Sequence, residues 1–169
     1  PLQTDTAPAS RRGDHLVCVA RTTTRKGIDR ALKIAEVTGR RIDLIGSDDG
    51  PPHANAHGEL SRTDTLALVR SARALVLTPR TDSQGLGAEG LGLCLLEAAS
   101  MGVPSIGCDT GGVSEALGPG LLLDNPDEPN GAAINAWLMD DGHGERAKAW
   151  VVKHHGPAQA VDTLMRGLL

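Results

Sequence analysis

Short apolar runs that alternate with stretches of helical periodicity constrain the fold of this chain more than any other feature. The first run, residues 16–20, is followed by helical spacing of apolar residues over 28–37. Further strands are predicted at 42–45, 54–57, 74–77, 104–107 and 121–123, and further helices at 63–70, 91–101, 113–117 and from 131 onward, with breaks near Gly142 and Gly156.

The strand runs are apolar throughout rather than at every second position. Such strands are typical of a parallel sheet that helices cover on both faces. We therefore expect a single α/β domain with a Rossmann-like, doubly wound parallel sheet. Ligands of such sheets bind at the carboxyl ends of the strands, so the loops after 20, 45, 77 and 106 are the candidate site loops.

The composition limits which residue types can form the core and which classes of partner the chain can bind. The 169 residues contain no Phe, no Tyr and two Trp, so the core must consist of Leu, Val, Ile and Ala. The net charge is −4 and there is no long basic run, which disfavours nucleic-acid binding through a basic, aromatic-lined face. No apolar run approaches the roughly 18 residues that a membrane-spanning helix needs.

The cysteines indicate the redox compartment of the chain, and its first residues indicate a linker. Cys18, Cys94 and Cys108 are odd in number and far apart, which argues against a disulfide framework and favours a reducing, cytoplasmic compartment. Residues 1–14 are polar and rich in Pro, Thr and Ala, as expected of an interdomain linker that leads into a domain at 15–169. The chain begins at Pro1 rather than Met, so we expect a longer native protein.

A basic turn follows the first predicted strand. Arg21, Arg25 and Lys26 lie between this strand and the next helix. Cations beside a helix N-terminus favour anion binding, because the backbone amides and the helix dipole add to their charge. A solvated surface turn is the alternative interpretation.

The glycine-rich stretch 85–97 contains the second candidate site. Gly90 and Gly92 would let the backbone approach a ligand at the start of a helix, where free amides favour a phosphate. Glu89 in the loop and Glu97 in the helix could face one pocket. Alternatively, Glu89 only stabilises the helix start and Glu97 is an exposed helical carboxylate.

A dinucleotide-binding fingerprint is a competing interpretation of the same stretch. Gly85, Gly87 and Gly90 match G-x-G-x-x-G, and Asp109 follows near the end of the next strand. The fingerprint should start in the tight turn directly after a strand, whereas an irregular segment separates Leu77 from Gly85. This spacing disfavours the dinucleotide interpretation.

Taken together, the motifs resemble a known family. The segment 89–115, EGLGLCLLEAASMGVPSIGCDTGGVSE, is similar to the E-x7-E and GGxxE motifs of the C-terminal, donor-binding domain of retaining GT-B glycosyltransferases (family 4, or group 1). Arg21, Lys26 and Gly27 match the upstream basic motif, and Gly58 to Ser61 resemble the turn before the second helix. The resemblance extends over nearly the whole chain and implies a domain that binds a nucleoside diphosphate sugar.

The resemblance also implies a role for each motif. Arg21 and Lys26 would bind the diphosphate and, with Glu89 on the transferred sugar, form the catalytic set. Glu97 would accept hydrogen bonds from the ribose hydroxyls. The other implied donor-binding residues are Gly90, Leu91, Gly92 and Leu93 at the phosphates, Gly58, Glu59 and Leu60 at the base, and Glu115.

The resemblance further implies that the chain is half of an enzyme. The acceptor site of this family lies in an N-terminal domain, so we expect donor binding without turnover by this chain alone. No cofactor and no obligatory metal are implied, and the neighbouring pairs Asp48–Asp49 and Asp140–Asp141 lack the D-x-D spacing. An epimerase-type GT-B relative and a non-catalytic nucleotide-binding module stay open as alternatives.

Overall fold

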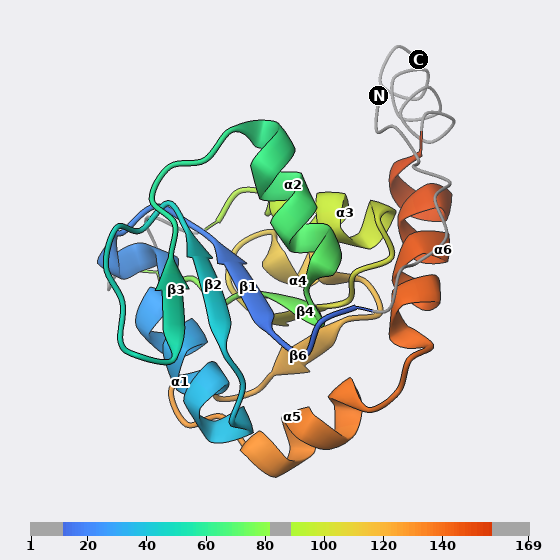
Figure 1. Ribbon diagram of the computed structural model, residues 1–169. Helices are drawn as coiled ribbons and strands as arrows, with labels where there is room; N and C mark the ends of the chain where they lie inside the picture. Colours follow the sequence, from blue (N-terminus) through green and yellow to red (C-terminus); the bar gives the residue numbers. More distant parts are fainter. Residues whose placement is uncertain (1–11, 82–88, 157–169) are drawn as a thin grey trace.

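A parallel sheet forms the centre of the computed structural model, which describes residues 12–81 and 89–156 (Figure 1). Within these residues its six strands are β1 (Leu16–Val19), β2 (Ile42–Ile45), β3 (Ala54–Ala56), β4 (Ala74–Leu77), β5 (Ser105–Cys108) and β6 (Leu121–Leu123). Their order is β3-β2-β1-β4-β5-β6, and every neighbouring pair is parallel. The predicted doubly wound sheet is confirmed, and the strand order reverses between β1 and β4.

Helices connect the strands. They are α1 (Ile28–Thr38), α2 (Arg62–Ser71), α3 (Leu93–Ser100), α4 (Val113–Leu117), α5 (Gly131–Leu138) and α6 (His143–His155), preceded by the 3₁₀ turn η1 (Thr24–Lys26). α3 begins two residues later than predicted, because Gly92 adopts a left-handed φ of 64° as its N-cap. The sequence pattern does not predict η1, since three residues carry no hydrophobic periodicity.

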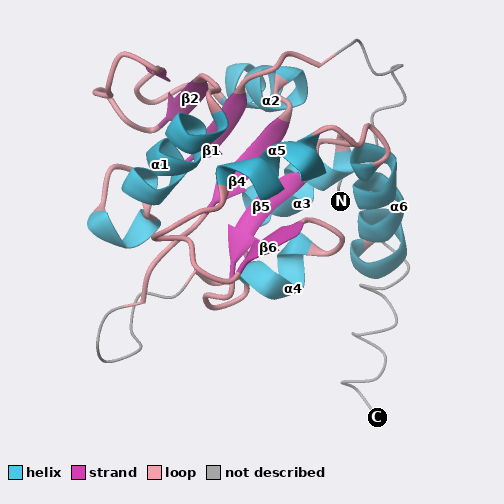
Figure 2. Cartoon of the chain, turned by 90° about the horizontal axis from the view of Figure 1, so that it is seen from below, coloured by secondary structure: helices cyan, strands magenta, loops and turns pink. Residues whose placement is uncertain are grey.

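The helices cover both faces of the sheet. Figure 2 shows α1 and α5 in front of the strands, and Figure 1 shows α2, α3 and α6 on the other side. Successive strand residues enter different core layers: Leu16 and Cys18 pack with α1 and α5, whereas Val17 packs with the opposite helices. Both layers are aliphatic, as the composition predicts, and the largest fully buried side chains are Leu, Ile and Val.

The structure also describes the end of the predicted linker and the three cysteines. The Gly13 amide donates to the Ser71 carbonyl at 2.8 Å, so contacts with the domain begin before β1. Cys18, Cys94 and Cys108 are free thiols, and burial raises the pKa of Cys18 to about 12. In residues 12–81 and 89–156, no helix has the length and apolar character needed to cross a bilayer.

Candidate functional site

Lys26 and Glu89 meet where the loops after β1 and β4 adjoin. Lys26 is the last residue of η1, and its Nζ atom lies 2.5 Å from Oε2 of Glu89. The Lys26 side chain is 38% exposed and that of Glu89 is 18% exposed, so solvent and ligands reach the pair. Two residues predicted to share one site are therefore in direct contact.

Glu97, the second acidic residue of the motif, projects from α3 and pairs with α2. Its Oε1 atom lies 2.8 Å from Nη1 of Arg62, the first residue of α2. Arg62 is absent from the residues that the motifs predict. Its pairing with Glu97 depends on tertiary structure, and the only local signal is its place just after Ser61, which caps α2 through the Asp64 amide.

The loop after β5 closes on the loop that holds Glu89. The Gly112 amide donates to the Glu89 carbonyl at 2.9 Å, and a Cβ atom on Gly112 would lie 1.9 Å from the Gly90 carbonyl oxygen. Only glycine permits this approach at position 112, and Gly111 before it has a left-handed φ of 60°. Glu115, in the first turn of α4, is exposed.

The start of α3 presents backbone groups at the same edge of the sheet. Gly92 caps the helix with a left-handed backbone, and the first amides of any helix have no partner within it. Leu91 and Leu93 beside it are 36% and 66% exposed, while Gly90 is also exposed. The segment therefore offers amide donors and the positive end of the helix dipole to an anion.

Glycine contacts join the loops after β1, β2 and β3. The Gly46 amide donates to the Gly58 carbonyl at 2.6 Å, the Gly58 amide donates to the Ser47 carbonyl at 2.8 Å, and the Thr22 amide donates to the Gly46 carbonyl at 3.2 Å. Gly58 has a left-handed φ of 62°, Glu59 is exposed, and Leu60 packs against the core. Arg21 lies in the first of these loops and is exposed.

An ion-pair network holds the segment after β4 against η1 and α1. Arg80 binds the Asp29 carboxylate through Nη1 at 2.5 Å and Asp127 through Nη2 at 2.8 Å, and its amide donates to the Arg25 carbonyl at 2.7 Å. Arg30 donates to Asp127 at 2.8 Å and to the Pro79 carbonyl at 2.9 Å. The hydrogen bond from Arg30 lowers the pKa of Asp127 to about 2, and that from Arg80 lowers the pKa of Asp29.

This network predicts a stability difference that depends on pH. Because folding lowers the pKa of Asp127 to about 2, its contribution is present above the unfolded-state pKa of about 3.9 and is lost as pH falls toward 2. We expect Asp127→Asn to be less stable than the parent at pH 7, by a small amount because the side chain is 54% exposed, and the two stabilities to converge near pH 2. Urea denaturation of the parent and the variant between pH 7 and pH 2 measures the two free energies of unfolding. Asp124→Asn, outside the network, is the control, and its stability should show no such convergence with that of the parent. A difference in stability between Asp127→Asn and the parent that stays constant from pH 7 to pH 2 would contradict the role given to Asp127 in the network.

A buried carboxylate, Asp43, lies in β2 and pairs with a histidine. Nε2 of His57 lies 2.7 Å from Oδ1 of Asp43, and the Asn55 amide donates to the same oxygen at 3.0 Å. No group of three or more potential metal-ligating residues occurs in the described parts of the chain.

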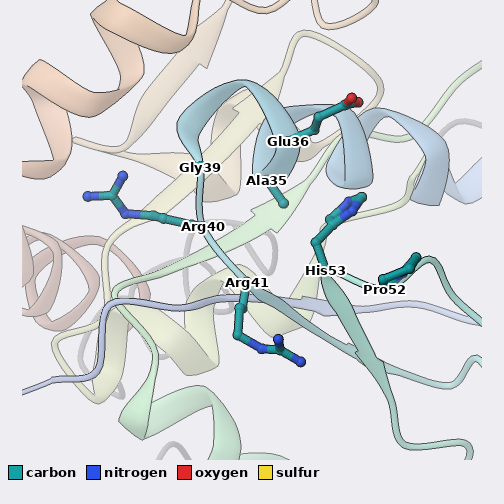
Figure 3. Close-up of a pocket in the computed structure, with 7 residues that line it drawn as sticks. All are labelled: Ala35, Glu36, Gly39, Arg40, Arg41, Pro52 and His53. Atoms are coloured by element: carbon teal, nitrogen blue, oxygen red, sulfur yellow. The ribbon is translucent and has the colours of Figure 1, made fainter.

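A cavity of about 510 Å³ lies at the opposite end of the strands, between the end of α1 and the residues before β3. It is lined by Ala35, Glu36, Gly39, Arg40, Arg41, Pro52 and His53 (Figure 3). Figure 3 shows that the Arg40 and Arg41 side chains point in different directions and away from His53. Their guanidinium groups bind Asp14 and Asn55, so the basic groups do not converge on one ligand position.

Parts of the sequence predictions fall outside the described residues. Gly85 and Gly87 of the dinucleotide fingerprint lie within 82–88, and most of the predicted linker lies within 1–11. The remaining predicted site residues are distributed over the loops after β1, β3, β4 and β5 and over the start of α3, all at the carboxyl edge of the sheet.

Solved structures with a similar fold include a glycosyltransferase. AviGT4, a glycosyltransferase involved in avilamycin A biosynthesis, superposes with a TM-score of 0.70 at 21% identity over 84% of this chain and 47% of that chain. TarM superposes with a TM-score of 0.75 at 16% identity over 97% of this chain and 37% of that chain. At these identities the likeness shows the fold, which is that of a GT-B domain.

Sequence comparison identifies the family. A mannosyltransferase of Corynebacterium glutamicum, named GDP-mannose-dependent monoacylated alpha-(1-6)-phosphatidylinositol monomannoside mannosyltransferase, is 30% identical over 156 residues, which cover 82% of this chain and 39% of the relative. The chain thus spans about two fifths of the length of this relative. The profile of the glycosyl transferases of group 1 matches residues 40–152. The chain belongs to the glycosyl transferases of group 1 and is a domain of the GT-B type.

Proposed function

We propose that this chain is the donor-binding half of a retaining glycosyltransferase that transfers a sugar from a nucleoside diphosphate sugar to an acceptor hydroxyl. The contact between Lys26 and Glu89 carries the proposal. It joins the basic turn after β1 to the E-x7-E loop after β4, at the edge where parallel α/β sheets bind their ligands. The cation suits a diphosphate, and the carboxylate suits the hydroxyls of a sugar.

The remaining roles follow the chemistry of such a donor. Lys26 and Arg21 stabilise the charge that develops on the leaving diphosphate, together with the amides at the start of α3. Glu97 accepts hydrogen bonds from the ribose hydroxyls, and main-chain groups of Gly58 to Leu60 contact the base. The reaction proceeds by front-face attack of the acceptor hydroxyl on an oxocarbenium-like centre, without an obligatory metal.

The acceptor site belongs to a separate N-terminal domain in this proposal. The chain spans 39% and 42% of two curated relatives, which leaves length for such a domain in them. Both are named as GDP-mannose-dependent, so GDP-mannose is the first donor to test. This chain alone would bind the donor and not transfer its sugar to an acceptor.

Isothermal titration calorimetry of the chain with GDP, UDP, ADP and their sugar conjugates tests the proposal. We expect saturable binding of at least one diphosphate series and weaker binding of its nucleoside, because the phosphates supply the charged contacts. Product analysis after incubation of the bound sugar conjugate with an acceptor lipid should show no sugar transfer. Absence of binding in every series would refute donor binding by this chain.

A further inference from the structure

Arg62 contacts one oxygen of the Glu97 carboxylate. Nη1 of Arg62 contacts Oε1 of Glu97 at 2.8 Å, and this ion pair joins α2 to α3. The Glu97 side chain is 23% exposed, so it is partly desolvated but open to a ligand, whereas that of Arg62 is 73% exposed. An ionised carboxylate accepts several hydrogen bonds, so its unused lone pairs can still receive donors from a ligand.

The pair also changes the electrostatics of the site for an anionic ligand. An isolated carboxylate on α3 would repel a diphosphate bound near the start of the same helix. The guanidinium offsets this charge, while the carboxylate oxygens can still accept hydrogen bonds from a ligand. Lys26 has the equivalent position at Glu89, so each glutamate of the motif has a cation beside it.

We propose that Arg62 is a positioning residue that orients the Glu97 carboxylate toward the ribose diol and thereby sets the preference of this domain for ribonucleotides over 2′-deoxyribonucleotides. The proposal rests on the nucleotide-binding function proposed above. Arg62 acts in this proposal through Glu97, because its contact is to the Glu97 carboxylate.

Calorimetry with GDP and 2′-deoxy-GDP, or with the corresponding pair from whichever series binds, measures this preference. Glu97→Gln should lower the ribose-to-deoxyribose affinity ratio by about 10-fold, since a hydrogen bond to a charged group is lost. Arg62→Ala should lower the ratio by about two- to fivefold, the range for an exposed ion pair. Arg62→Lys should restore part of it. When Arg62→Ala is combined with Glu97→Gln, the ratio should stay at the value of Glu97→Gln alone, because no carboxylate remains to be oriented.

The controls separate this proposal from a structural role and from the proposed function. Arg41→Ala removes an arginine at the opposite end of the sheet and should leave the ratio unchanged. An Arg62→Ala variant that weakens both nucleotides equally, or that leaves the ratio at the parent value, would overturn the proposal. Failure of the parent chain to bind any nucleotide would instead overturn the donor-binding function.

Discussion

Gly27→Ala is expected to lower the free energy of unfolding by about 3 kcal/mol or more, from backbone strain and overpacking together. Gly27 lies between η1 and α1 with a left-handed φ of 66°. A Cβ atom there would lie 1.9 Å from the Thr78 carbonyl oxygen and 2.8 Å from its carbon, both of which are backbone atoms. The loop after β4 would have to move away from η1.

Gly39→Ala is the matched control for this substitution. Gly39 has nearly the same left-handed backbone, with a φ of 67°, and a Cβ atom there would have no heavy atom of the described residues within 4 Å, its own chain neighbours aside. It should therefore cost about 1 kcal/mol, from backbone strain alone. Urea denaturation of the two variants isolates the contact between Gly27 and Thr78. Equal losses of stability would show that this contact does not hold the two loops together.

Gly27→Ala should also weaken nucleotide binding under conditions where the variant is folded. Lys26 precedes Gly27, and its contact with Glu89 requires the loops after β1 and β4 to adjoin. Gly39 follows α1 at the opposite end of the sheet, so Gly39→Ala should retain the parent affinity. Calorimetry at a temperature well below both unfolding transitions measures the difference.

The fold could be predicted because both faces of the sheet are buried. Strands with two buried faces are largely apolar, as in β4, which is apolar and buried at every position. β2, β4 and β6 begin and end at the predicted residues. Boundaries were less accurate where backbone conformation rather than side-chain burial ends an element. The start of α3 depends on the left-handed Gly92, and β5 is shifted by one residue to Ser105–Cys108.

The candidate site was predictable only in its location. Parallel strands bring the loops after β1 and β4 to one edge, so proximity of the basic turn and the acidic loop follows from topology. The particular side-chain partners within the site do not follow from the topology. Arg62 and Glu97 belong to different helices, and no local pattern indicates that their side chains meet at 2.8 Å. Nor does the β2 sequence indicate that buried Asp43 is held by His57.

Lys26→Ala is expected to weaken the binding of a nucleoside diphosphate by about 10- to 100-fold, the loss of one charge-assisted contact with phosphate. The affinity for the corresponding nucleoside should stay at the parent value, because the proposed ribose and base contacts involve Glu97 and Gly58 to Leu60. Calorimetry with GDP and guanosine, or with the pair of the series that binds, measures both affinities.

Lys33→Ala is the matched control, since it removes the same charge from the next segment of the chain. Lys33 lies on α1 and donates to the Asp127 carbonyl at 2.7 Å, away from Glu89. Its loss changes the net charge equally, so any general electrostatic effect appears in both variants and falls with added salt. Equal weakening by the two substitutions would mean that Lys26 acts only through net charge. A selective loss for Lys26→Ala that persists at about 0.5 M NaCl would instead support direct contact with the phosphates, since salt screens distant charges more strongly than contacting ones.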